Sequence, residues 1–127
     1  MYRPILPFLI SYKNGIPLKY FGLVDSGADK SYMGVEFTSI LGIKNLEKGK
    51  MEQVAGVNGV SAAYFHPVAL NIGGHRFSTE IGFVTDSNLT SSGYALLGQM
   101  GLFDHFDVRF SFKKLEMELT YIGVIKK

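Results

Sequence analysis

The stretch FGLVDSGADKSYM, residues 21–33, decides how the rest of the chain is interpreted. An apolar run from Phe21 to Val24, broken by one glycine, ends abruptly in Asp25, Ser26 and Gly27. Hydrophobic residues up to the point where a carboxylate occurs predict a buried strand that delivers Asp25 to a cleft. Gly27 then lets the chain turn and lets another backbone approach closely. The tripeptide by itself is more typical of a strand that ends in an Asx-type turn.

Two stretches of the sequence resemble the motifs of the retropepsin-like aspartic peptidases. Leu23–Asp29, LVDSGAD, resembles their motif of two hydrophobic residues followed by Asp-Thr/Ser-Gly-Ala. Ala95–Gly98, ALLG, resembles their second hallmark, two apolar residues and a glycine before a short helix. The next residues, 99–110, resemble the helix and returning strand of cellular and bacterial members, and the whole resemblance spans residues 5–112. Two motifs in the right order are more specific than either alone.

The resemblance implies a fold as well as an activity. It implies that residues 1–127 form a single retropepsin-like domain, mostly β, with the closed β-barrel of an acid-protease lobe. One or two short helices and a flap hairpin complete this fold. In the family the two motif strands cross in a psi-shaped arrangement that places the aspartate at the bottom of a cleft.

Size and composition fit one ordinary globular domain. Apolar residues make up 46% and charged residues 19%, and ten Phe and seven Tyr favour strands. A net charge of +2 from scattered lysines gives no reason to expect a nucleic-acid partner. Without cysteine there is no disulfide framework, thiolate chemistry or Cys-based metal site. No stretch approaches the roughly 18 apolar residues of a membrane span, so the default expectation is a cytoplasmic protein without a membrane partner.

Short turns that contain Asn-Gly or Gly-Gly between apolar runs predict three hairpins. The first joins 5–12 to 16–24 through Lys13-Asn14-Gly15, and the third joins 68–72 to 75–84 through Gly73-Gly74. The second joins 51–57 to 60–70 through Asn58-Gly59. Its small, glycine-bearing tip suits a mobile cover over a peptide, and its place in the chain matches the flap of the retropepsin-like fold.

The remaining segments predict two short helices and a last hairpin. Apolar residues at 37, 40 and 41 predict a helix that ends at Gly42, and a second short helix is expected over 99–103. Residues 46–50 are expected to form a loop; their Gly49-Lys50 pair lacks the spacing of a phosphate-binding loop. Alternating apolar residues predict two half-buried strands joined at Lys113-Lys114: Phe106, Val108, Phe110 and Phe112, then Leu115, Met117, Leu119 and Tyr121.

The chemistry of the family implies two chains. It needs two carboxylates that share a proton and hold one water, because like charges about 3 Å apart cannot both ionise. One carboxylate activates the water and the other protonates the leaving group, so no metal and no cofactor is required. The sequence holds one Asp-Ser/Thr-Gly, and Asp86-Ser87-Asn88 lacks the glycine. Asp25 must therefore meet the Asp25 of a second chain in a symmetric homodimer that hydrolyses peptides or proteins.

The resemblance also assigns roles to the residues around Asp25. Ser26 is expected to hydrogen-bond across the dimer axis, and Gly27 and Ala28 to offer backbone and a small wall to the peptide. Asp29 is expected to contact the substrate backbone or brace the site. The flap tip, which includes Val57, Asn58 and Gly59, is expected to close over the peptide, with a preference for apolar side chains.

The sequence departs from the retroviral pattern at two places. Retroviral members follow the second glycine with an arginine that pairs with the aspartate matching Asp29, whereas this chain has Gln99. The chain also continues through a C-terminal hairpin in place of one short strand. A different dimer interface could therefore replace the sheet of interleaved chain ends that viral members form. The cellular branch is the nearer comparison.

Other functions are weighed against a peptidase. A catalytically silent peptide-binding or dimerisation module of the same fold stays open, although such a module needs no aspartate at position 25. A metal-dependent hydrolase is unsupported, because His66, His75 and His105 have no ligand spacing. A serine hydrolase is unsupported too, since no G-x-S-x-G occurs.

Overall fold

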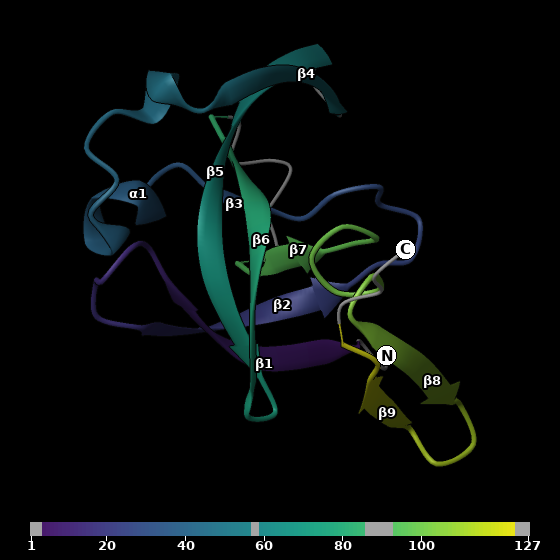
Figure 1. Ribbon diagram of the computed structural model, residues 1–127. Helices are drawn as coiled ribbons and strands as arrows, with labels where there is room; N and C mark the ends of the chain where they lie inside the picture. The colour runs from purple at the N-terminus through teal and green to yellow at the C-terminus, as the bar shows by residue number, and fades with distance from the viewer. Residues whose placement is uncertain (1–3, 57–58, 86–92, 124–127) are drawn as a thin grey trace.

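The computed structural model describes residues 4–56, 59–85 and 93–123. Strands dominate them, as Figure 1 shows. The elements in chain order are β1 (Ile5–Ser11), β2 (Leu18–Val24), β3 (Tyr32–Gly34), α1 (Phe37–Leu41), the 3-10 helix η1 (Leu46–Lys48), β4 (Lys50–Gly56), β5 (Gly59–Ile72), β6 (His75–Val84), β7 (Ala95–Leu97), β8 (Phe106–Ser111) and β9 (Glu116–Tyr121). No helix among the described residues is long and apolar enough to cross a membrane.

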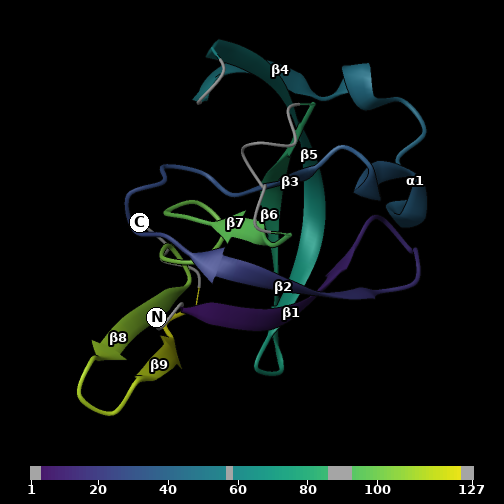
Figure 2. The same ribbon diagram turned by 180° about the vertical axis from the view of Figure 1, so that it is seen from behind.

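Six of these strands close into a barrel. Their order is β1-β2-β7-β3-β6-β5, and the ring closes because β1 pairs with β2 on one edge and with β5 on the other. β4 lies outside the ring as the partner of β5, and this hairpin stands away from the barrel in Figures 1 and 2. The expected fold class, a mostly β closed barrel with short helices and a hairpin in the position of a flap, is therefore confirmed.

The short strand β7 lies between β2 and β3, although β2 and β3 are consecutive in the chain. β7 runs parallel to β2, with Val24 opposite Leu97, and antiparallel to β3, with Tyr32 opposite Leu96. The segment that joins β2 to β3 must therefore pass the end of β7. This is the psi-shaped crossing that the resemblance implied, and it places residues 25–31 at the end of three strands.

The core fills the barrel with side chains from most of its strands. Fully buried members include Ile10, Met33, Leu70, Ile81, Phe83 and Leu97. Along β2 alternate residues face this core: Gly22 and Val24 are buried and Leu18 and Tyr20 are partly buried, whereas Phe21 is 43% exposed. The predicted strand before Asp25 forms, but it is buried on one face only, because its other face lies on the outside of the barrel. Gly22 leaves room for Leu97, whose Cδ1 lies 2.5 Å from the position of a Cβ at residue 22.

The three predicted hairpins all form, with differences at their turns. Gly73 and Gly74 have φ of 59° and 86°, as a two-residue turn between β5 and β6 requires. The β4–β5 hairpin is paired up to Gly56 and Gly59, and its predicted tip residues Val57 and Asn58 lie outside the described residues. The first hairpin has a longer connection than predicted, residues 12–17, in which Lys13 takes the positive φ of 53°.

The predicted helices are confirmed at one place and wrong at another. α1 ends at Gly42, whose φ of 87° and N–H bond to the Ser39 carbonyl form the expected C-terminal cap. Residues 46–48, expected to be loop, form η1. Residues 99–103 form a series of turns and no helix, because Gly98 pairs with Gly101 in a bridge and Gly101 has a φ of 116°.

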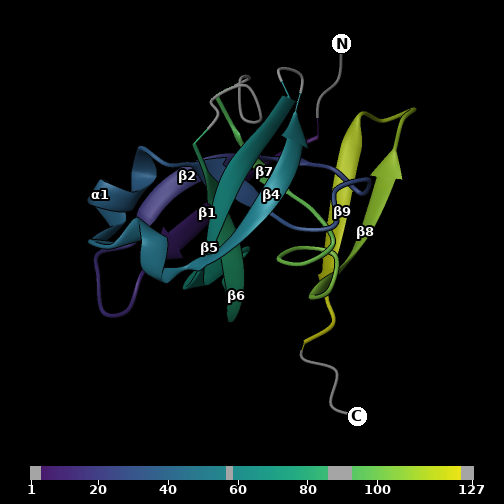
Figure 3. The same cartoon turned by 90° about the horizontal axis from the view of Figure 1, so that it is seen from above.

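The C-terminal hairpin β8–β9 is a separate two-stranded sheet beside the barrel (Figure 3). Its base packs on β6, where the Phe106 ring contacts Phe77 and the Tyr121 ring stacks on His75 at 4.3 Å. The predicted half-buried alternation is wrong farther out, because Phe110 is 47% and Phe112 86% exposed. The outer part of the hairpin extends past the barrel surface.

Candidate active site

Asp25 follows the last residue of β2 and is attached to the neighbouring strand. Its backbone N–H donates to the Leu97 carbonyl at 2.9 Å, which continues the β2–β7 pairing by one residue. The backbone N–H of Gly27 donates to Oδ1 of Asp25 at 2.9 Å. The carboxylate is partly exposed. Strand pairing therefore fixes where the carboxylate starts, and the turn that follows fixes how it points.

The turn after β7 holds the Asp25 loop from the other side. The N–H of Gln99 donates to the Ala28 carbonyl at 2.8 Å, and the N–H of Met100 donates to the Asp29 carbonyl at 2.9 Å. Gly98 allows this approach, since a Cβ there would lie 2.4 Å from the carbonyl oxygens of Ala28 and Lys30. The two sequence motifs are thus two halves of one structural unit.

Ser31 is a residue of this unit that the sequence did not single out. It is fully buried, its hydroxyl donates to the Met100 carbonyl at 2.7 Å, and its Oγ accepts the Gly98 N–H at 3.0 Å. Both partners belong to the turn after β7. A serine just before a short strand carries no signal of its own, so the pairing of the two motifs in space was needed to find it.

Gln99, identified in the sequence as a departure from the retroviral pattern, acts within its own chain. Its side-chain Nε2 donates to the Ser26 carbonyl at 2.7 Å. The amide therefore braces the exposed part of the loop next to Asp25.

The predicted site residues divide into one group that lies together and one that does not. Asp25, Ser26, Gly27, Ala28 and Asp29 form a single loop in which Ser26, Gly27 and Asp29 are exposed. The Ala28 N–H bonds to the Asp25 carbonyl at 3.2 Å and its carbonyl accepts from Gln99, so its backbone is engaged within the chain. Gly59 is exposed on the β4–β5 hairpin with a φ of 107°, and no hydrogen bond among the described residues joins it to the loop.

One ion pair connects the loop to the base of that hairpin. The Lys30 ammonium pairs with the Glu52 carboxylate of β4, with both side chains about one-third exposed (32% and 30%), and it lies 4.8 Å from the centre of the Phe65 ring. Tyr32 packs edge-on against Phe65. Burial raises the pKa of the Tyr32 hydroxyl, Lys30 lowers it, and Glu52 and Asp29 raise it. Lys30, Glu52 and Asp29 are therefore close enough to Tyr32 to change the pKa of its hydroxyl.

The histidines lie in separate structural surroundings. His66 is buried on β5 with Nε2 2.7 Å from the Leu46 carbonyl, His75 stacks on Tyr121, and His105 stacks on Phe77 at 4.1 Å. Within residues 4–56, 59–85 and 93–123, no group of three His, Asp or Glu side chains is arranged to hold a metal ion.

The closed barrel, the crossing of β2 past β7 and the projecting hairpin together form the retropepsin-like lobe that the motifs implied. No protein-family model matches the chain, and no curated protein matches it. Among solved structures the chain is similar to a retroviral protease, the EIAV protease complexed with the inhibitor HBY-793. The sequence identity is 26%, the TM-score is 0.49, and the match covers 76% of this chain and 82% of that chain.

Proposed function

We propose that this chain is an aspartic endopeptidase of the retropepsin-like family, in its cellular or bacterial branch, and that it acts as a homodimer. The observation that carries the proposal is the fixed carboxylate of Asp25. A strand pair holds its backbone, a glycine N–H orients its Oδ1, and its side chain reaches the surface. An Asx turn with a purely structural role would not need a second segment bonded to it, as residues 98–100 are bonded to this loop.

The reaction follows from two such carboxylates and a water. When the Asp25 side chains of two copies lie side by side, one stays protonated because two like charges at about 3 Å repel strongly. The ionised partner removes a proton from the water, which attacks the peptide carbonyl. The protonated partner donates to the developing oxyanion and then to the leaving nitrogen. The reaction needs no cofactor.

The residues around Asp25 have distinct roles in this proposal. Ser26, which is exposed, hydrogen-bonds to the partner's loop across the dimer axis. Gly27 offers its carbonyl to the peptide, while Ala28 contributes its methyl group as a wall because its own backbone groups are already bonded. Asp29 contacts the substrate backbone. The hairpin tip with Val57, Asn58 and Gly59 covers the peptide, with a preference for apolar substrate side chains.

The test is digestion of a diverse peptide mixture at about pH 4 to 7, a range that brackets the upper ionisation of paired carboxylates. Three proteins are compared: the wild type, Asp25→Asn and Asp107→Asn. Asp107 is exposed on β8, so its variant has the same chemical change away from the loop. We expect cleavage by the wild type and by Asp107→Asn, and none by Asp25→Asn. The cleaved bonds also give the side-chain preference.

The alternative is a silent peptide-binding module of the same fold. Absence of cleavage by a wild-type protein that is dimeric in solution supports that module and contradicts the proposal. Cleavage that persists in Asp25→Asn also contradicts it.

A further inference from the structure

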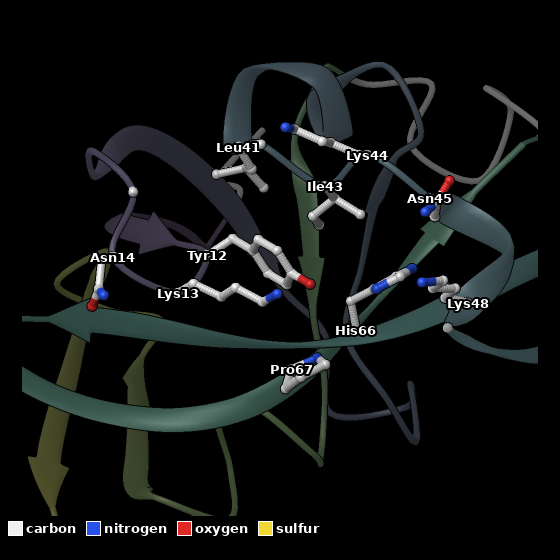
Figure 4. Close-up of a pocket in the computed structure, with 13 residues that line it drawn as sticks. Tyr12, Lys13, Asn14, Leu41, Ile43, Lys44, Asn45, Lys48, His66 and Pro67 are labelled. Carbon is white, nitrogen blue, oxygen red and sulfur yellow. The ribbon is translucent and has the colours of Figure 1, made fainter.

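A cavity of about 650 Å³ lies between the β1–β2 connection, the segment from α1 to η1, and β5 (Figure 4). Its volume lies within the range of small-molecule sites, about 300 to 1,000 Å³. The residues that line it are Tyr12, Lys13, Asn14, Gly15, Leu41, Gly42, Ile43, Lys44, Asn45, Lys48, Gly49, His66 and Pro67.

This cavity is separate from the Asp25 loop. The connection that forms one of its walls precedes β2, and Asp25 follows β2. A seven-residue strand spans about 20 Å, so the two places are at opposite ends of β2. A ligand of the cavity is therefore independent of a peptide bound at Asp25.

The cavity carries positive charge without a matching carboxylate. Lys13 lines it from the β1–β2 connection, Lys44 and Lys48 line it from the segment between α1 and the end of η1, and no Asp or Glu is among its lining residues. None of the three lysines forms an ion pair with the carboxylates of the part of the chain that the structure describes. Glu47 lies in η1 beside Lys48, is exposed and does not line the cavity. In Figure 4 the Lys13 and Lys48 ammonium groups point toward the space around the His66 ring from two sides.

The lining also has an apolar part beside a histidine whose ring is fixed in place. Leu41 and Ile43 are buried, and the Tyr12 ring meets the His66 ring edge-on at 6.4 Å. Because a carbonyl only accepts, the His66 Nε2–H donates to the Leu46 carbonyl at 2.7 Å, which fixes the ring's orientation. Gly49 leaves room for this ring, since a Cβ there would lie 2.5 Å from Nε2.

We propose that this cavity binds a small organic phosphate. A phosphate monoester carries about −1.5 to −2 charge at pH 7, which suits a lining that holds three lysine ammonium groups, two of which point toward the same space. The amides of Asn14 and Asn45 supply further hydrogen bonds, and the organic part of the ligand packs on Tyr12, Leu41 and Ile43. The same chemistry accounts for both halves of the lining, which an inorganic anion or an apolar ligand alone does not.

Phenyl phosphate is the probe, titrated into the isotope-labelled full chain and followed by amide chemical shifts. We expect saturable shifts at residues around the cavity, tighter binding than for inorganic phosphate, and no saturable binding of phenol. A variant with Lys13→Gln, Lys44→Gln and Lys48→Gln is expected to bind more weakly, with a Kd at least about tenfold higher. Lys48→Gln alone is measured as a milder variant, with a smaller loss of the same sign.

A matched control separates this site from general charge attraction. Lys19→Gln, Lys113→Gln and Lys114→Gln removes three exposed lysines outside the cavity and is expected to change the Kd by less than about twofold. Equal weakening in both triple variants overturns the proposal, as does absence of saturation in the wild type up to about 10 mM. Equal affinity for phenol, or for inorganic phosphate, overturns the assignment of an organic phosphate. Asp25→Asn is expected to bind the probe like the wild type, so the peptidase proposal is tested separately.

Discussion

At the scale of single residues, the candidate active site depends on where a side chain is absent. Gly98 has two carbonyl oxygens, of Ala28 and Lys30, within 2.4 Å of the position that a Cβ would take. Backbone atoms cannot move aside as the end of a flexible side chain can. The Asp25 loop is therefore positioned by close backbone contact with the turn after β7.

We predict that Gly98→Ala displaces this loop. The expected cost is about 1–3 kcal/mol in the free energy of unfolding, the usual range for overpacking, with loss of peptidase activity in the molecules that stay folded. Urea unfolding and the rate of peptide cleavage per folded molecule measure the two effects. Gly74→Ala is the control: it has open space but a φ of 86°, so it costs stability and keeps activity. Full activity in folded Gly98→Ala contradicts this account of the loop.

Gln99 gives a second prediction at this scale. Gln99→Met keeps the length of the side chain and removes the N–H donor to the Ser26 carbonyl. Because the bond lies at the surface, the loss in unfolding free energy is about 0.5–1.5 kcal/mol. Activity is expected to fall several-fold, since the freed carbonyl is next to Asp25. Unchanged kcat/KM in a correctly folded Gln99→Met protein contradicts a bracing role.

The sequence was informative about these residues to different degrees. Asp25 could be predicted because an apolar run that ends in Asp-Ser-Gly is a local pattern. Ser31 could not, because its partners Gly98 and Met100 are distant in sequence and come close only when β7 lies beside the loop. The bond between the Ala28 carbonyl and the Gln99 N–H could not be predicted either, because it arises from tertiary pairing.

At the scale of elements, β2 is bonded to β7 and to the residues just before β7. Its last residue pairs with β7, and the hydroxyl of Tyr20 donates to the carbonyl of Gly93, just before β7. The Tyr20 ring also packs on Phe8 and Phe37. The Tyr20 side chain thus connects β2 to β1, to α1 and to the segment just before β7.

Tyr20 predicts how stability changes at high pH. Burial, and then the nearby Glu36 and Tyr94, raise the pKa of Tyr20 above its ordinary value of 10.0. The phenol's contribution is complete below about pH 10, the pKa in the unfolded chain, and is lost as pH rises through the higher folded value. The difference in unfolding free energy between wild type and Tyr20→Phe is therefore expected to be constant from pH 7 to 9 and to shrink above pH 10. A difference that stays constant to pH 11 contradicts this.

Local patterns predicted features that depend on one residue better than features that depend on tertiary contacts. Gly42 marked the end of α1 correctly because a left-handed cap depends on one residue. The helix expected over 99–103 does not form, since the bridge between Gly98 and Gly101 draws this segment toward the Asp25 loop. Phe110 and Phe112 alternate like core residues, yet the hairpin that carries them extends past the barrel, which no local pattern reveals.

At the scale of the whole molecule, the single chain forms a complete barrel, whereas the candidate active site holds one carboxylate of the two that the proposed mechanism needs. The barrel closes through β1 and β5 and buries a core made of its own side chains. The exposed Ser26, Gly27 and Asp29 instead leave the Asp25 loop uncovered at the surface. The proposed peptidase mechanism requires a second carboxylate there, which in the proposed homodimer is the Asp25 of a symmetric second copy.

Mixing wild type with Asp25→Asn tests this arrangement directly. At equal amounts and with random exchange, about half of the wild-type chains pair with an inactive partner, so activity per wild-type chain falls by about half. A tenfold excess of the variant reduces it by roughly tenfold, because few wild-type pairs remain. Asp107→Asn, added in the same amounts, is the control and adds its own activity. If activity per wild-type chain is unchanged by Asp25→Asn under conditions where subunits exchange, each chain works without the carboxylate of a partner, and the shared-proton mechanism does not apply.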